Sequence, residues 1–200
     1  MNDSPAVRVR PATTEDLDGI VTCSVALLTE DAAARDPRVE PLWALHHGRK
    51  SFAATLADPA CLLLAAVTGE GDATVPGGWQ DVAAQGGGPG AETATAVVGY
   101  LIGVLAEPVG VLPIRSATLR ALYVAPEHRG NGTGGRLTDD FFGWARERGA
   151  ARAEVNAYAA NAAGLRFYER QGFTPRAIRL DLDLDTLSPP PHTPEASPGF

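Results

Sequence analysis

The chain has 200 residues, of which 44% are hydrophobic, and this is enough for one domain with a sizeable core. A formal net charge of −7 and a pI near 5.0 argue against nucleic acid or an anionic membrane as the main partner. Two cysteines and no charged-then-apolar leader indicate reduced thiols and a cytoplasmic protein. The longest apolar run, residues 61–67, is too short to cross a bilayer.

The N-terminal third predicts a strand, two helices and a second strand. The first strand shows polar–apolar alternation, the two helices show apolar residues at helical spacing, and the second strand is a continuous apolar run. They are expected, in chain order, at Val7–Arg10, from Thr13 or Thr14 to about Leu28, at about Leu42–Leu56, and at Cys61–Thr68. His46 and His47 lie in the second helix, where neighbouring side chains point about 100° apart, so we expect no metal site there.

Residues 70–94 are the most unusual segment, because they are rich in Gly, Pro and Ala. Such a composition cannot bury enough apolar surface to offset the entropy lost on ordering. We therefore expect a long flexible loop between two hairpin strands, not a second domain. Residues 188–200 are Pro-rich and predict a disordered tail, which leaves residues 1–187 as a single domain.

The remaining chain predicts two adjacent strands and then alternating helices and strands. They are expected at Thr95–Leu105 (strand), Ser116–Val124 (strand), Gly132–Arg148 (helix), Ala151–Ala157 (strand), Asn161–Arg170 (helix) and Phe173–Leu184 (strand). Gly99 and Gly103 indicate a bulge or a close approach by another group. Strict alternation from Ile178 predicts one wet and one buried face for the last strand. This order predicts an antiparallel meander followed by a parallel crossover, in an α+β (mixed α/β) domain with helices on both faces of one sheet.

The sequence Arg129–Gly135 (RGNGTGG) lies between a predicted strand and a predicted helix. Pro126 ends the strand, because proline has no N–H to donate. Glycines that lead into a helix start present free backbone N–H groups to an anion, and the helix dipole adds positive potential at the same place. The stretch therefore predicts a site for a phosphate-bearing ligand.

Two common phosphate-binding loops are alternatives for this stretch. A Walker loop is excluded, because it needs Gly-Lys-Ser/Thr and Gly135 is followed by arginine. The pattern Gly130-x-Gly132-x-x-Gly135 matches a dinucleotide fingerprint, and Glu154 lies about where a ribose carboxylate is expected. However, five residues separate the strand from these glycines, and a meander precedes it. A nucleotide-binding oxidoreductase is the weaker alternative.

Two motifs together resemble the GNAT superfamily of acyl-CoA-dependent N-acetyltransferases. Arg129-x-x-Gly132-x-Gly134, preceded by Leu122-Tyr123-Val124-x-Pro126, is similar to the family's acyl-CoA-binding motif. Asn161–Phe173 (NAAGLRFYERQGF) is similar to its second motif, in which Asn opens a helix and a Tyr-Glu pair precedes Gly-Phe. The resemblance covers about Thr95–Leu184 and extends to Val7–Asp16. It implies a mixed, mostly antiparallel sheet of six to seven strands with helices on both faces.

The resemblance also implies an enzyme that transfers an acetyl group from acetyl-CoA directly to a primary amine, without a metal. Tyr168 would protonate the departing thiolate as general acid, and Asn161 would hydrogen-bond the pantetheine arm. From the residues alone, Tyr168 could instead anchor the core and Asn161 could cap a helix. Backbone groups of a bulged, splayed strand at Leu122, Tyr123 and Val124 would polarise the thioester carbonyl. The residues expected around the pyrophosphate are Arg129, Gly130, Asn131, Gly132, Thr133, Gly134 and Gly135.

The general base is not identified by the sequence. Many relatives carry a glutamate on the strand before the loop, but this strand (SATLRALYV) has no carboxylate. Glu154 is the first candidate, Glu107 the second, and a water chain is the alternative. The missing carboxylate also keeps open a second function, a CoA-binding sensor or partner module without catalysis.

The acceptor is expected to be a small-molecule or peptide amine. In the family, the first two helices and their connection contribute to acceptor specificity. The residues of this chain in that region are Glu30, Asp31, Asp36, Trp43 and His46, and their carboxylates suit a cationic amine. A homodimer that pairs Ile178–Leu184 between chains is compatible with the sequence.

Overall fold

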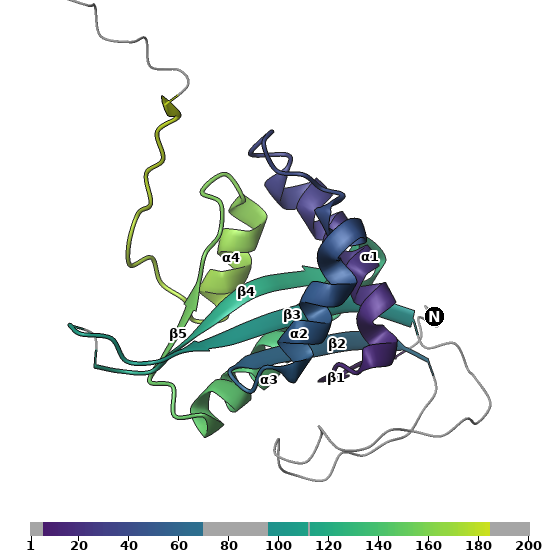
Figure 1. Ribbon diagram of the computed structural model, residues 1–200, viewed down its shortest axis with the longest axis horizontal. Helices are drawn as coiled ribbons and strands as arrows, with labels where there is room; N and C mark the ends of the chain where they lie inside the picture. The colour runs from purple at the N-terminus through teal and green to yellow at the C-terminus, as the bar shows by residue number, and fades with distance from the viewer. Residues whose placement is uncertain (1–5, 70–95, 112, 185–200) are drawn as a thin grey trace, which may run out of the picture.

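A five-stranded sheet forms the centre of the protein in the computed structural model, which describes residues 6–69, 96–111 and 113–184 (Figure 1). The strands lie side by side in chain order. They are β1 (Val7–Pro11), β2 (Cys61–Thr68), β3 (Ala96–Ala106), β4 (Ser116–Val124) and β5 (Arg152–Val155). Neighbouring strands from β1 to β4 are antiparallel, and β5 is parallel to β4. The predicted meander, crossover and α+β class are therefore confirmed.

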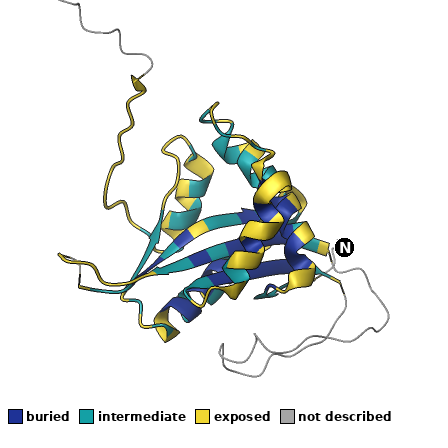
Figure 2. Ribbon diagram, in the orientation of Figure 1, coloured by how far each residue is buried: buried dark blue, intermediate teal, exposed yellow. Residues whose placement is uncertain are grey.

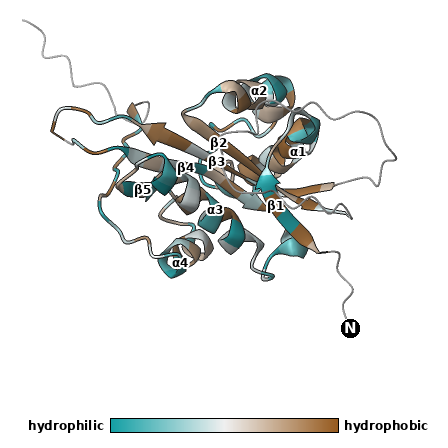
Figure 3. Cartoon of the chain, turned by 90° about the horizontal axis from the view of Figure 1, so that it is seen from below, coloured by the Kyte–Doolittle hydropathy of each residue, from teal (hydrophilic) through white to brown (hydrophobic). Residues whose placement is uncertain are grey.

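Helices cover both faces of this sheet (Figure 3). On one face lie α1 (Leu17–Leu27) and α2 (Arg49–Ala57), and on the other lie α3 (Thr133–Glu147) and α4 (Ala162–Arg170). Short turns extend or join these helices. They are η1 (Thr14–Asp16) before α1, the π-helical turn η2 (Leu28–Ala32) after it, η3 (Ala44–Gly48) before α2, and η5 (Pro126–His128) between β4 and α3.

The hydrophobic core is divided into two layers by the sheet. Ile20 of α1, Phe52 of α2 and Tyr100 of β3 belong to one layer. Leu101 of β3 and Trp144 of α3 belong to the other. Tyr100 and Leu101 are neighbours in sequence, and they enter opposite layers because successive strand residues point to opposite faces. Figure 2 shows that much of the central strands is buried, and Figure 3 shows the helices on either side of them.

Two glycines allow other groups to approach β3 closely. A Cβ on Gly103 would lie 2.8 Å from a ring carbon of Phe141, and a Cβ on Gly99 would lie 2.6 Å from the carbonyl oxygen of Tyr123. The predicted close approach at these positions is confirmed. The register between β3 and β4 shifts after Ile102, where Arg120 is the additional residue on β4. Such a bulge bends the strand that carries it.

The prediction of a sixth strand at Phe173–Leu184 is wrong. Its residues are not part of the sheet, and Ile178 and Leu180 are 87% and 89% exposed. Figure 2 shows this segment extending away from the body of the protein. Alternation fits a strand, but a strand also requires a partner, and no described strand pairs with this segment. The described sheet accordingly has five strands, not six to seven.

Some predictions fall on residues that the structure does not describe. The loop at 70–94 and the tail at 188–200 both lie outside the described ranges. Within those ranges, no helix is long and apolar enough to cross a membrane.

Candidate cofactor-binding cleft

Strands β4 and β5 pair over only part of their length. Ser116–Leu119 pairs with Arg152–Val155, and beyond this point β4 pairs with β3 alone. The bulge at Arg120 lies where the two parallel strands part. The edge of β4 at Leu122–Val124 therefore has no strand partner among the described residues on the β5 side. An unpaired strand edge can hydrogen-bond an extended ligand.

A cavity of about 660 Å³ lies at this point, within the size range of small-molecule sites. Its walls come from β4, the glycine-rich loop, α4 and η2. Most of the predicted cofactor residues line it. They are Leu122, Tyr123, Val124, Arg129, Gly130, Gly132, Thr133, Gly134, Gly135, Asn161 and Tyr168. Asn131 and Glu154 do not line the cavity.

Two glycines give the glycine-rich loop a left-handed backbone at the start of α3. Gly130 and Gly132 have φ angles of 80° and 77°, a left-handed region that costs an L-residue about 1–2 kcal/mol. Gly132 is the N-cap of α3, and its carbonyl oxygen accepts from Arg136 N at 3.0 Å. The first N–H groups of α3 have no partner within the helix and lie at its positive end.

The loop and α4 approach each other closely at Gly134. A Cβ at this position would lie 3.2 Å from the ring of Phe167. A larger residue at this position would therefore require the Phe167 ring to shift. This packing brings α4 to the same cavity as the glycine-rich loop.

Asn161 opens α4 and faces the cleft. Its Oδ1 accepts from Gly164 N at 2.9 Å, which confirms the predicted N-cap. Its Nδ2 donates to Asp31 Oδ1 at 2.7 Å. One amide side chain thus fixes the start of α4 and links this helix to η2 across the cleft.

Tyr168 lies on the same helix, α4, and its ring packs in an aromatic cluster. Its ring lies 5.3 Å from that of Phe167 and 5.8 Å from that of Phe173. Burial, followed by the negative charge of Asp31, raises the pKa of Tyr168 to about 12. No described residue hydrogen-bonds its hydroxyl group. The phenol is therefore neutral at physiological pH and can donate a proton.

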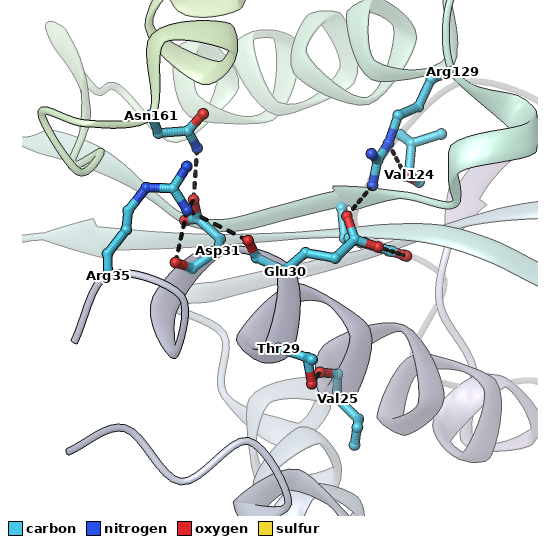
Figure 4. A network of polar contacts seen from close by, with 9 residues as sticks. Val25, Thr29, Glu30, Asp31, Arg35, Val124, Arg129 and Asn161 are labelled. Atoms are coloured by element: carbon cyan, nitrogen blue, oxygen red, sulfur yellow. Dashed lines mark hydrogen bonds and ion pairs between the residues drawn. The ribbon is translucent and has the colours of Figure 1, made fainter. Parts of the chain in front are cut away.

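Two consecutive carboxylates of η2 reach opposite walls of the cleft (Figure 4). Glu30 accepts from Arg129 Nη2 at 2.7 Å and from the Tyr123 hydroxyl at 3.0 Å. Asp31 accepts from Asn161 and forms an ion pair with Arg35 at 2.7 Å. Of the residues predicted near the acceptor, Glu30 and Asp31 line the cavity.

The other acceptor candidates, Asp36, Trp43 and His46, do not line it. Arg35 lines the cavity as well, and it was not among the residues predicted from the sequence. The helix was expected to end near Leu28, whereas helical turns continue through Ala32. The spacing of Asp31 and Arg35, four residues apart, is the signal that could have identified this ion pair.

The predicted base candidates lie outside the cavity lining. Glu154 Oε1 lies 3.5 Å from Arg152 Nη1 on the same strand, and Glu107 pairs with Arg115 at 2.9 Å. Within the described parts of the chain, no group of three or more His, Cys, Asp or Glu side chains could hold a metal.

Comparison with known proteins places the chain in a family. The model of the Acetyltransferase (GNAT) family matches residues 72–173. No curated protein sequence matches the chain. Similar solved structures include a GCN5-related N-acetyltransferase from Ralstonia eutropha JMP134, with 20% identity over 89% of this chain and 99% of that one and a TM-score of 0.60.

Two further structures share the fold over 89% of this chain and 99% of their own. A ribosomal-protein-alanine N-acetyltransferase from Brucella melitensis biovar Abortus 2308 has 20% identity and a TM-score of 0.56. A transcriptional regulator from Bacillus halodurans C-125 has 22% identity and a TM-score of 0.61. The family match, with the glycine-rich loop and the diverging strands, shows that this chain belongs to the GNAT family of acetyltransferases.

Proposed function

We propose that the protein is an N-acetyltransferase that transfers the acetyl group of acetyl-CoA to a primary amine by direct attack. One observation carries the proposal. The unpaired edge of β4, the glycine-rich loop at the start of α3, and the Tyr168 side chain of α4 all line one cavity. This combination offers sites for an extended arm, a diphosphate and a proton donor.

The residues of the cleft fit the chemistry of coenzyme A. The N–H groups of Arg129–Gly135 and the Arg129 guanidinium suit the diphosphate, because charged donors bind phosphate oxygens most strongly. The edge at Leu122–Val124 and the Asn161 amide suit the amides of the pantetheine arm. When bound, acetyl-CoA supplies the activated acyl group as a thioester.

The transfer requires one bond to form and one to break. The amine nitrogen bonds to the acetyl carbonyl carbon as the carbon–sulfur bond breaks. Tyr168 gives its phenolic proton to the departing sulfur, and the attacking nitrogen loses one proton. Backbone N–H groups at Leu122–Val124 would stabilise the negative charge on the carbonyl oxygen. Glu154 remains our candidate base from sequence, and it would act through water because it does not line the cavity.

Two measurements test the proposal. Calorimetric titration with coenzyme A and with NAD should give binding of coenzyme A alone. A panel of primary amines, from small polyamines to peptides with free N-termini, should then be screened with acetyl-CoA by detection of the released thiol. Binding of NAD without binding of coenzyme A would contradict the proposed function.

A second candidate function is a CoA-binding module without catalysis. It is favoured by one observation: the residues of β4 include no carboxylate, and Glu154 and Glu107 pair with arginines away from the cavity. The amine screen separates the two functions. Turnover well above the rate of acetyl-CoA hydrolysis would exclude the silent module.

A further inference from the structure

We propose that Glu30 gates the diphosphate end of the cleft: it holds Arg129 in the free protein, and the cofactor diphosphate displaces it. This inference rests on the proposed function, because Arg129 is assigned to the diphosphate there. It concerns a residue outside both sequence motifs, on the opposite wall of the cleft.

Arg129 is held in place by three contacts. Its Nη2 donates to Glu30 Oε2 at 2.7 Å, and its Nε donates to the Val124 carbonyl oxygen at 2.7 Å. Its guanidinium carbon lies 5.4 Å from the centre of the Tyr123 ring, a distance that allows a cation–π contact. The guanidinium is therefore oriented before any ligand binds, but one of its donors already has an anionic partner.

Glu30 is the exchangeable member of this group. The side chains of Glu30 and Arg129 are 42% and 48% exposed, so their ion pair is in contact with solvent and contributes little stability. A diphosphate offers several anionic oxygens, and the N–H groups of the glycine-rich loop bind it at the same time. The diphosphate can therefore compete with a single carboxylate for Arg129.

Asp31, the next residue, fixes η2 in position while Glu30 exchanges. It forms an ion pair with Arg35 and accepts from the Asn161 amide, both at 2.7 Å. Arg35 Nη1 also donates to the Asp31 carbonyl oxygen at 2.7 Å. Figure 4 shows Asp31 joined to Arg35 and Asn161 while Glu30 reaches Arg129. The contacts of Asp31 do not involve the Glu30 carboxylate, so the Glu30 side chain can exchange without breaking them.

The test is calorimetric titration with two probes, coenzyme A and pantetheine, which lacks the diphosphate. We expect Glu30→Gln to bind coenzyme A about three- to fivefold more tightly than the wild type, as the loss of an exposed ion pair allows. Pantetheine affinity should be unchanged. Glu127→Gln is the matched control, because it removes the same charge two residues from Arg129 without removing an ion pair with it.

A double-mutant cycle separates the effect of the Glu30–Arg129 contact from the effect of removing a negative charge. In an Arg129→Ala background, Glu30→Gln should give no further tightening. The inference is overturned if Glu30→Gln leaves coenzyme A affinity unchanged or lowers it. It is also overturned if the tightening persists without Arg129 or appears equally in Glu127→Gln. A wild-type protein that does not bind coenzyme A would overturn the proposed function as well, so the two failures are distinguishable.

Discussion

Tyr168 of α4 and Asp31 of η2 line the same cleft, and the charge of Asp31 adds to burial in raising the pKa of Tyr168 to about 12. A neutral phenol in this position supports its proposed role as proton donor. We expect Tyr168→Phe to lower kcat about tenfold or more, the range of general acid catalysis, with little change in affinity for coenzyme A.

The matched control for this change is Tyr158→Phe. Tyr158 is 39% exposed and does not line the cavity, so its hydroxyl should be dispensable. Thiol release under saturating acetyl-CoA measures kcat for both variants. An unchanged kcat in Tyr168→Phe would remove this residue from the mechanism.

The raised pKa of Tyr168 also predicts the pH dependence of kcat. Because the folded-state pKa lies above the ordinary value of about 10, the proton-donating form persists until the pH approaches about 12. We therefore expect no loss of kcat from tyrosine ionisation between about pH 8 and about pH 10. A falling limb with a midpoint near 10 in the wild type, absent from Tyr168→Phe, would contradict this prediction.

The left-handed conformation of Gly132 predicts that a substitution there weakens binding of the diphosphate part of coenzyme A. Alanine at φ 77° costs about 1 kcal/mol or more, so the loop should leave its binding conformation. We expect Gly132→Ala to weaken coenzyme A binding about tenfold and to leave pantetheine binding nearly unchanged. Calorimetric titration measures both affinities.

Gly143 is the control glycine, since it lies inside α3 and a Cβ there would meet no atom within 4 Å. Gly143→Ala should raise the free energy of unfolding by about 0.5–1 kcal/mol without affecting coenzyme A. Equal weakening of coenzyme A binding by both alanines would show that the loop conformation is not responsible.

An ion pair joins β1 to the start of α1 and should support stability. Arg10 Nη1 and Nη2 donate to the Asp16 carboxylate at 2.6 and 2.8 Å, and Thr13 N donates to it at 2.7 Å. Asp16 is buried, so Asp16→Asn should lower the free energy of unfolding by about 3 kcal/mol. Asp18→Asn, at an exposed ion pair with Arg49, should cost less than about 1 kcal/mol.

The contribution of Asp16 should also depend on pH. Burial opposes ionisation of Asp16, but hydrogen bonds from Arg10 and Thr13 and the charge of Arg10 lower its pKa below the ordinary value. Because the pKa of Asp16 is lower in the folded state, its ionised form stabilises the fold, and this contribution is complete at pH values above the unfolded-state pKa of about 4. The contribution is lost as the pH falls through the folded-state pKa. Urea unfolding below about pH 4 should therefore show a smaller difference between the wild type and Asp16→Asn.

Because the segment Ile178–Leu184 is exposed, truncating its apolar side chains should have little effect on the free energy of unfolding. Leu180 is 89% exposed, so Leu180→Ala should change the free energy of unfolding by less than about 0.5 kcal/mol. Leu101→Ala, at a fully buried position of β3, should cost about 2–5 kcal/mol. A large effect of Leu180→Ala, together with a dimer in sedimentation, would show that this segment is covered by a second chain.

Much of the fold could be predicted from local patterns. The strand at Ser116–Val124 was predicted with its observed bounds, and α4 begins directly after its predicted cap, Asn161. Period-2 and period-3.6 patterns report how a segment presents its apolar side chains, and caps report where helices begin. The same reasoning failed at Ile178–Leu184, because a pattern indicates a strand conformation but not the strand that would pair with it.

The amino-acid sequence by itself determined the glycine-rich loop, the helix cap at Asn161 and the pair of motifs that resemble the GNAT family, because each depends on residues close together in the chain. Only the tertiary structure decided that Glu30 contacts Arg129 and that Asp31 contacts Asn161, contacts that join residues 99 and 130 positions apart. It also left Glu154 outside the cavity lining. Contacts across a cleft depend on how the elements pack on the sheet, and the spacing of residues along the chain does not specify that packing.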